Sequence, residues 1–266
     1  MKKIFHSPRD VRLACRENRL EGFASDALAG FLCVNLVMMD KQYAGEFQAF
    51  CEANPVSCPL LKVLPVGEVS APDFGADLDL RTDLRSYDVI RNGENAGSVR
   101  DVRELHSPDM VSFLIGSSVS LDGYLVSKGM GPSWGPCIYL TNVPCQSVGV
   151  FKGNIAVTMR SYTKEMADQV AAFTSHFPWC HGAPLKRNDP ASLGIVDEVK
   201  DIFLPWKGGG WVPEGHDKLY WACGITPSLV ARAAKLPLMI VHTPGNALIT
   251  DIRTETLFDR KLAYSK

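Results

Sequence analysis

The sequence contains no apolar run long enough to cross a membrane. The longest such run, Phe31–Met39, is interrupted by Asn35, whereas a membrane-spanning helix needs about 20 apolar residues. The N-terminal segment MKKIFHSPRD has two lysines with no apolar stretch behind them, which is unlike a secretory signal peptide. We therefore expect a cytoplasmic protein without a membrane partner.

Neither sign of charge is in excess. The 266 residues include 28 Lys and Arg against 29 Asp and Glu, which gives a net charge of -1. Nucleic-acid-binding domains usually carry an excess of basic residues on one face. We therefore expect no nucleic-acid partner.

The sequence also lacks the short motifs that hold common cofactors. It has no G-x-G-x-x-G, P-loop, H-E-x-x-H or G-x-S-x-G segment. Its eight cysteines include no C-x-x-C pair, and their spacings fit no structural zinc site. We expect no cofactor and no bound metal, and we expect most of the cysteines to fill the core as small apolar side chains.

What is present is the composition of an ordinary globular protein, with 46% hydrophobic and 21% charged residues. A chain of this length buries roughly 70–75% of its unfolded surface, so its core needs no disulfide support. Segments typical of strands alternate with segments typical of helices. This alternation predicts an α/β fold.

Local patterns predict several of these elements. Ser7 before a proline is typical of a helix start, and Asp40 can begin a second helix directly after the buried strand Phe31–Met39. Asn92-Gly93 between two short strand-like runs predicts a hairpin turn. Ser107, again before a proline, predicts another helix over the apolar residues that follow.

The last quarter of the chain has the clearest pattern. A strand over Leu219–Cys223, a helix from Thr226 to Ala234 and a strand over Leu238–His242 predict a β-α-β unit with parallel strands. The carboxyl ends of both strands would then meet at one edge of the sheet. Ligands of open α/β sheets bind at that edge.

Chemically useful groups lie at this predicted edge. Cys223 supplies a thiol and His242 an imidazole, while Gly224 and Gly245 permit close approach of a ligand to the backbone. Thr226 would cap a helix whose free N–H groups can hold a carboxylate. Each of these residues also has a purely structural interpretation, as core, strand end or helix cap.

Three further loops carry candidate groups. Asn142 and Cys145 follow a strand and offer an amide and a thiol nucleophile. His181 lies in a loop rich in Gly and Pro, where a surface turn is the alternative. Arg81 can clamp a carboxylate beside Asp83, although the pair could equally be a surface ion pair.

Asn35 is unusual because it interrupts an otherwise apolar strand. A buried amide must be hydrogen-bonded, since burial without a partner costs free energy. Asn35 is therefore either a structural hydrogen-bonding centre or a ligand contact.

Eight segments, taken in order, resemble the hydro-lyase family that contains D-glutamate cyclase. The likeness runs from about residue 8 to residue 255. The segments are GFLCVNL (30–36), CPLL (58–61), ADLDLRTDLRSY (76–87), FLIGSSVS (113–120), TNVPC (141–145), HGAP (181–184), WACGITP (221–227) and HTPGNALITD (242–251). Eight segments in the same order are far more specific than any single one.

The resemblance implies a fold, a location and an activity. Members of the family are cytoplasmic in bacteria and mitochondrial in animals. The implied fold is a larger three-layer α/β domain, formed by residues 1–133 and 216–266, with a smaller two-layer α+β domain inserted at 134–215. The implied activity is the dehydrative cyclisation of D-glutamate to 5-oxo-D-proline, without a cofactor.

The chain departs from the family pattern at several positions. Cys33 replaces a usual Gln, Ser117 and Val119 stand in a G-C-S-F-S motif, and Ser228 replaces a Gln. The segment 207–211 is also atypical. These departures leave the expected reaction class unchanged. The expected substrate is D-glutamate or a related acidic amino acid.

Such a condensation needs a carboxylate clamp, a base for the ammonium and donors for an oxyanion. The hypothesis assigns the clamp to Arg81 or Arg160 and the base to His242 or His181, with Asn142 among the oxyanion donors. The cysteines at 145 and 223 leave a thioester route open beside a non-covalent one. Two alternative functions also stay open, namely a Cys-His amidase or hydrolase acting on a small amide and a non-catalytic amino-acid binder. Assembly into a homo-oligomer stays open as well.

Overall fold

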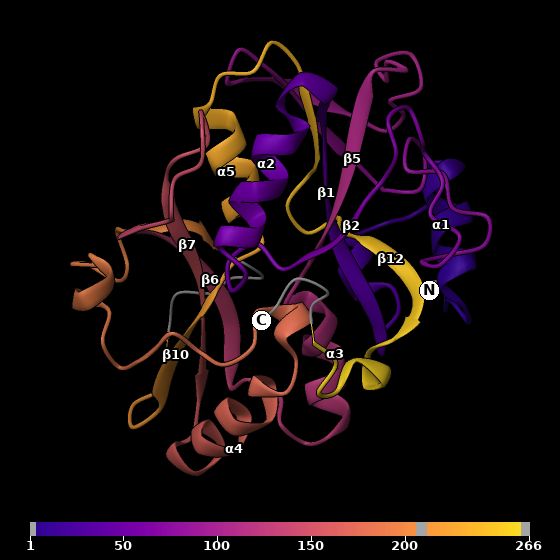
Figure 1. Cartoon of the computed structure of the whole chain (residues 1–266). Helices are drawn as coiled ribbons and strands as arrows, with labels where there is room; N and C mark the ends of the chain where they lie inside the picture. The colour runs from indigo at the N-terminus through magenta and orange to yellow at the C-terminus, as the bar shows by residue number, and fades with distance from the viewer. Residues whose placement is uncertain (1–3, 206–211, 262–266) are drawn as a thin grey trace.

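The computed structural model describes residues 4–205 and 212–261 (Figure 1). The helices are α1 (Pro8–Arg16), α2 (Lys41–Ala53), α3 (Val119–Ser127), α4 (Lys164–Ser175) and α5 (Thr226–Ala233). The strands are β1 (Phe31–Asp40), β2 (Leu60–Val63), β3 (Tyr87–Arg91), β4 (Glu94–Val99), β5 (Met110–Gly116), β6 (Trp134–Pro144), β7 (Asn154–Tyr162), β8 (Lys186–Arg187), β9 (Ile202–Pro205), β10 (Asp217–Ala222), β11 (Met239–His242) and β12 (Leu248–Arg253). The atypical segment 207–211 lies outside the described residues.

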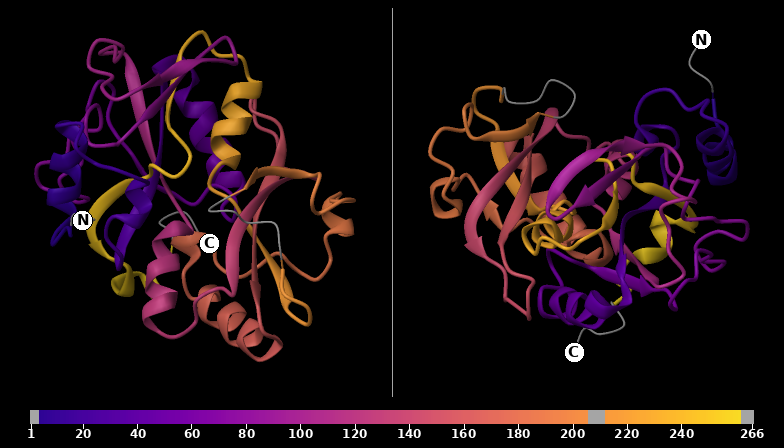
Figure 2. Two further views of the ribbon diagram at one scale, coloured as in Figure 1. Left: turned by 180° about the vertical axis from the view of Figure 1, so that it is seen from behind. Right: turned by 90° about the horizontal axis from the view of Figure 1, so that it is seen from above.

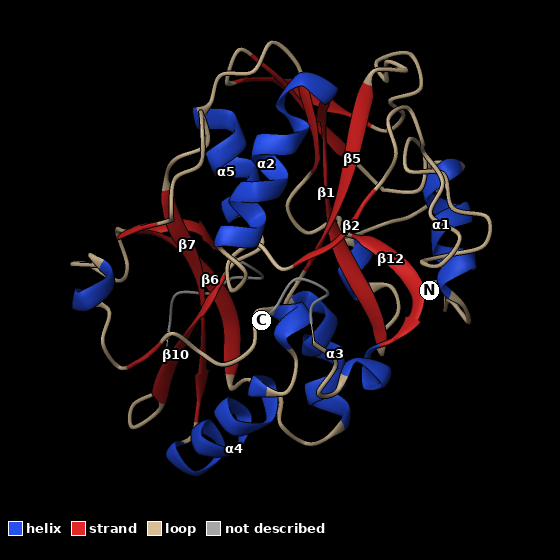
Figure 3. Ribbon diagram, viewed as in Figure 1, coloured by secondary structure: helices blue, strands red, loops and turns tan. Residues whose placement is uncertain are grey.

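The strands form two separate sheets (Figure 3). The first has the order β2-β5-β1-β11-β3-β4, with β12 also paired to β1, and the second has the order β8-β10-β7-β6-β9. Every strand pair in the described part of the chain is antiparallel. The chain thus combines helices with sheets, as an α/β fold requires.

The predicted parallel β-α-β unit is wrong. β10 pairs with β7 in the second sheet, whereas β11 pairs with β1 and β3 in the first. Helix α5 therefore crosses from one sheet to the other. The periodicity was consistent with strand, helix and strand, but it carries no information about which ladder each strand joins.

Several local predictions are confirmed. Ser7 begins α1 with a capping box, in which it exchanges hydrogen bonds with Asp10. The Asp40 side chain accepts a hydrogen bond from the backbone N–H of Gln42 at the start of α2. The Asn92-Gly93 turn joins β3 to β4 as a hairpin.

The helix predicted after Ser107 is instead the strand β5. Every residue of β5 is buried, and the strand pairs with β1 from Asp40↔Met110 to Val34↔Gly116. A short apolar run that is buried on both faces shows no alternation of apolar and polar residues. Its hydrophobic pattern therefore cannot distinguish a strand from a helix. The long ladder with β1 decides the outcome.

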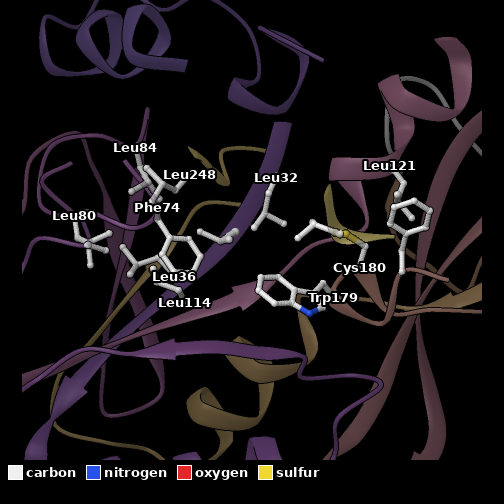
Figure 4. Packing of buried hydrophobic residues seen from close by; sticks show 14 of the residues in the cluster. Leu32, Leu36, Phe74, Leu80, Leu84, Leu114, Leu121, Trp179, Cys180 and Leu248 are labelled. Atoms are coloured by element: carbon white, nitrogen blue, oxygen red, sulfur yellow. The ribbon is translucent and has the colours of Figure 1, made fainter. Parts of the chain in front are cut away.

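The core lies on the faces of both sheets and continues between them. Figure 4 shows Leu32 of β1 close to Trp179 and Cys180, and Leu36 of β1 close to Phe74 and Leu114, in one cluster drawn from distant parts of the chain. All eight cysteines are buried, in agreement with the predicted role of most of them as core side chains.

Helices α2 and α5 lie side by side where the two sheets approach each other, as the opposite views of Figures 1 and 2 show. Phe47 and Phe50 of α2 share a buried cluster with Val230 of α5 and Phe151. This packing holds α5 in place between the two sheets. No helix in the described ranges is long and apolar enough to span a membrane.

The first sheet takes its strands from residues 31–116 and 239–253, and the second from residues 134–222. The division into a domain of residues 1–133 and 216–266 and an inserted domain of residues 134–215 stays a prediction. The same holds for the cytoplasmic location.

Replacing Gly116 by Ala is expected to destabilise the fold by about 3 kcal/mol or more. A Cβ atom there would overlap the Trp179 carbonyl oxygen and lie 2.9 Å from its carbonyl carbon, and backbone cannot rotate aside. Urea unfolding measures the change. Gly45→Ala in α2 is the matched control, because nothing lies within 4 Å of its Cβ position and Ala favours the helix. Equal stability of the two variants would contradict the prediction.

Candidate active site

A cavity of about 240 Å³ opens between the two sheets. Its wall combines Asn35 of β1 and His242 of β11 with Thr158 and Arg160 of β7. The remaining lining comes mainly from α3, α5 and the turns beside them. The further lining residues are Asp88, Ile90, Ser117, Ser118, Val119, Asp122, Pro136, Ile138, Phe203, Leu204, Cys223, Gly224, Ile225, Ser228, Leu229, Arg232, Val241, Pro244 and Gly245.

The strand pairing explains why the cavity lies beside Asn35. One edge of β1 pairs with β12 as far as Val34 and with β11 from Val37 onward. Between these ladders the chain that joins β11 to β12 turns away, with Gly245 at a positive φ of 84°. Asn35 thus lies between the β1–β12 pairing and the β1–β11 pairing, and its side chain lines the cavity.

Asn35 is held by its own side-chain hydrogen bond. It is buried, and its Nδ2 donates to the Gly116 carbonyl oxygen over 3.1 Å. Gly224 lies directly against it, because a Cβ atom on Gly224 would overlap Asn35 Nδ2 and lie 3.0 Å from Cγ. The Asn35 amide therefore makes a structural hydrogen bond and also lines the cavity. Both interpretations from the sequence, a structural hydrogen-bonding centre and a ligand contact, are compatible with this position.

Arg160 places a positive charge in the cavity wall. Its side chain is 5% exposed, and its Nε donates to Asp122 Oδ1 over 2.9 Å. Nη2 reaches Ser118 Oγ at 3.3 Å, and the guanidinium lies 5.6 Å from the Trp221 ring centre. Burial opposes the charge, but the Asp122 carboxylate raises the pKa of Arg160. The cation is thus kept charged and oriented away from bulk water.

His181 presents a free ring nitrogen next to the cavity. Its Nδ1 lies 2.8 Å from the Val56 carbonyl oxygen, so Nδ1 carries the hydrogen and Nε2 carries the lone pair. Nε2 is buried without a hydrogen-bond partner in the described structure, 3.4 Å from the Cβ position of Gly224. Burial lowers the pKa of His181 to about 4. The imidazole is neutral at pH 7.

His242 lines the cavity at the end of β11. Its Nδ1 faces the Leu36 carbonyl oxygen at 3.5 Å. Burial lowers the pKa of His242 to about 4, although Leu36 and the charge of Asp88 act in the other direction. One neutral imidazole, that of His242, thus lines the cavity together with the buried guanidinium of Arg160, and the neutral imidazole of His181 lies beside Gly224 of the same lining.

Two groups on the α5 side complete the polar lining. Burial raises the pKa of the Cys223 thiol, so it is protonated at neutral pH. The Ser228 hydroxyl is buried without a partner in the described structure. A ligand in the cavity could bond to it.

Thr226 is buried and does not line the cavity. Its Oγ1 donates to the Cys223 carbonyl oxygen over 2.8 Å and accepts from the Ala156 N–H over 3.0 Å. The expected helix cap is incorrect, because the N-cap residue of α5 is Ile225 and makes no side-chain cap bond. Thr226 instead fastens the start of α5 to β7.

Arg81 and Asp83 lie in a different part of the molecule. Arg81 makes a two-pronged ion pair with Asp79, and the buried Asp83 accepts hydrogen bonds from Arg16 of α1. The Asp83–Arg16 pair attaches the loop to α1, whereas the Arg81–Asp79 pair lies within the loop, so the predicted surface pair of Arg81 with Asp83 does not form. The structure does not bring either residue to the cavity.

Asn142 and Cys145 are also apart from the cavity. Asn142 is exposed and packs against Gly194. Cys145 belongs to an apolar cluster with Cys58 and Phe151, and burial raises its pKa to about 11. Their predicted part in catalysis has no geometric support.

Sequence reasoning missed Asp122, Ser118, Thr158 and Arg232 as lining residues. A usable signal existed for Thr158, which lies two residues before Arg160 in a strand and therefore on the same face. Asp122 and Ser118 become recognisable only through their contacts with Arg160. Among the described residues, no group of three His, Cys, Asp or Glu side chains could hold a metal ion.

Gly224→Ala is expected to abolish most activity, because the new methyl group displaces the Asn35 amide. The double variant Asn35→Ala/Gly224→Ala removes the overlapping atoms, so it should regain stability but not activity. Thermal unfolding and turnover of both variants test this. Full activity of the single variant would show that Asn35 is not needed where it lies.

Comparison with known proteins agrees with the resemblance. The sequence profile of the family described as D-glutamate cyclase matches residues 111–251. A "Putative hydro-lyase" from Staphylococcus haemolyticus is 38% identical over 95% of this chain and 98% of its own length. Another, from Afipia carboxidovorans, is 34% identical over 94% of this chain and 93% of its own length.

Among solved structures, a nitrogen repressor-like protein from Methanococcus jannaschii matches with a TM-score of 0.38 at 12% identity. The match covers 89% of this chain and 94% of that chain. A likeness this weak carries no argument. The sequence matches, in contrast, cover nearly the whole chain, and the protein belongs to the hydro-lyase family whose profile is described as D-glutamate cyclase.

Proposed function

We propose that this protein catalyses the dehydrative cyclisation of an acidic amino acid, D-glutamate or a close analogue, without a cofactor. The observation that carries the proposal is the combination in one small cavity wall of a buried, charged Arg160 and a neutral His242, with the free Nε2 of His181 beside it. A cation suits a carboxylate substrate, and neutral imidazoles suit proton transfer.

Arg160 binds a substrate carboxylate. Its contacts with Asp122 and Ser118 use Nε and Nη2, and a guanidinium has five N–H donors. The Nη1 side is therefore available to a ligand. Arg232, which also lines the cavity, supplies a second cation for the other carboxylate.

Proton transfer falls to His242, because it lines the cavity. Its Nε2 takes a proton from the substrate ammonium, and the resulting amine attacks the side-chain carboxyl carbon. A C–N bond forms and a C–O bond breaks. The attacking nitrogen loses a second proton after it adds to the carboxyl carbon. The imidazolium of His242, a strong acid with a pKa of about 4, delivers the two protons in turn to the departing oxygen, which leaves as water.

Asn35 and His181 assist at the same place. The second N–H of the Asn35 amide can stabilise the oxyanion that forms as the amine adds. The free Nε2 of His181 can accept a hydrogen bond from the substrate nitrogen. Gly224 lets both groups approach, since any side chain at that position would overlap Asn35.

A non-covalent route is favoured over a thioester. The Cys223 thiol has its pKa raised by burial, whereas a nucleophilic cysteine needs a lowered pKa. Cys145 lies in the apolar cluster, away from the cavity. The same two facts speak against the Cys-His amidase.

The test is incubation of the full chain with D- and L-forms of acidic amino acids, in buffer with and without a chelator. Mass spectrometry should detect loss of one water from at least one compound, unaffected by the chelator. Binding without any product would instead identify an amino-acid binder. Hydrolysis of a small amide would identify an amidase.

A further inference from the structure

Part of the cavity lining, contributed by β6, β9 and α5, is apolar. It is formed by Ile138, Leu204, Ile225 and Leu229, which we call the apolar wall. All four line the cavity and pack in one cluster with Cys223 and Ala156. The wall thus belongs to the binding site itself.

The pairing of β7, β6 and β9 determines where the cavity lining changes from polar to apolar. Thr158 and Arg160 lie on one face of β7, because side chains two residues apart share a face. Ile138 of β6 pairs with Thr158, and Leu204 of β9 pairs with Ile138. Since neighbouring strands lie about 4.8 Å apart, the cavity lining changes from polar to apolar over about 10 Å, from β7 to the edge strand β9.

Helix α5 covers the apolar end from the other side. Leu229 lies three residues after Thr226, which fastens the start of α5 to β7, and Ile225 is the N-cap residue of the helix. Both pack with Ile138 and Leu204 in the same cluster. Ile138 is 8% exposed, whereas Leu204, Ile225 and Leu229 are half-buried, so this end of the cavity is partly enclosed.

We propose that the natural substrate is an acidic amino acid that carries an apolar substituent on its side chain. The inference rests on the proposed function and specifies its substrate class. Glutamate has a charged group at each end and nothing to cover the apolar wall. A substituent on the carbon next to the side-chain carboxyl would extend along β6 toward β9, while one carboxylate stays at Arg160 and the other at Arg232.

The expected gain follows from apolar burial. Each buried methylene contributes about 0.8 kcal/mol, which is roughly a fourfold change in affinity or in kcat/KM. A propyl group that fills the wall should therefore raise kcat/KM over that of D-glutamate by between ten- and a hundredfold.

The experiment uses the full chain and a series of D-glutamates with hydrogen, methyl, propyl or benzyl on that carbon. Loss of water is followed by mass spectrometry, and ligand binding is followed in parallel by the shift in unfolding temperature. Leu204→Ala should reduce the preference for propyl over hydrogen at least fivefold. Ile202→Ala is the matched control, because Ile202 lies on the same strand but packs with the cluster around Tyr139 on the opposite face.

The outcomes separate the two proposals. Turnover that rises along the series and loses this dependence in Leu204→Ala supports the inference. Turnover of D-glutamate with no gain from any substituent overturns the inference but leaves the proposed function standing. Water loss from no compound overturns the proposed function, and the inference with it.

Discussion

Replacing His242 by Gln is expected to lower kcat/KM by a factor of about 10² to 10⁴, the usual contribution of a general acid–base group. His242 lines the cavity, and burial keeps it neutral by lowering its pKa to about 4. Glutamine can replace its hydrogen bond to the Leu36 carbonyl but cannot transfer a proton. The substrate complex should therefore form while the chemical step fails, so kcat should fall far more than KM rises.

The control for this variant is His176→Gln. His176 is a half-buried histidine that pairs with Asp259 and stacks on Phe258, and it does not line the cavity. It should keep full activity. His181→Gln should show a smaller loss than His242→Gln, because the proposed mechanism gives His181 only a hydrogen bond to the substrate nitrogen and assigns the proton to His242. Full turnover of the true substrate by both His181→Gln and His242→Gln would show that neither histidine takes part.

Acidification from pH 7 to pH 4 is expected to lower the free energy of unfolding by several kcal/mol. Burial lowers the pKa of both His181 and His242 to about 4, whereas an imidazole in the unfolded chain titrates near pH 6.5. Between these pH values the unfolded chain binds protons that the folded chain does not. The stability therefore falls as the pH drops below about 6.5, and this loss levels off below about 4, at about 3 kcal/mol for each histidine.

Urea unfolding at several pH values between 7 and 4 measures this loss. The double variant His181→Gln/His242→Gln should show a much flatter dependence, because it lacks both titrating groups. Carboxylates with a lowered pKa add to the loss only near the acidic end of this window, because Asp and Glu in the unfolded chain titrate near pH 4. Burial opposes the charge of Asp77, for example, but hydrogen bonds from Arg12 lower its pKa below the usual value, so its charge is lost only at lower pH. An equally steep dependence in the double variant would contradict the assignment.

Much of the local structure was predictable because neighbouring residues decide it. Ser7 and Asp40 begin helices because their side chains accept bonds from backbone N–H groups two or three residues ahead. The Asn92-Gly93 turn depends on two residues that tolerate positive φ. The buried strand over Phe31–Met39 and the family also follow from the order of residues alone.

The site was only partly predictable. Cys223, Gly224, His242 and Gly245 do line the cavity, although they were expected there through a parallel sheet that does not form. They meet because α5 crosses between two antiparallel sheets. Asn35 was recognised because an amide inside an apolar strand is anomalous.

The remaining outcomes depended on contacts between distant segments. The residues after Ser107 form β5 because β1 pairs with them along their whole length. Arg160 becomes a buried, charged group only through Asp122, and His181 acquires a free Nε2 only because the Val56 carbonyl takes its Nδ1 hydrogen. Local chemistry thus determined where most elements begin and which family the chain belongs to. Long-range pairing and burial, which no sequence spacing records, determined which side chains share a cavity and how they are charged there.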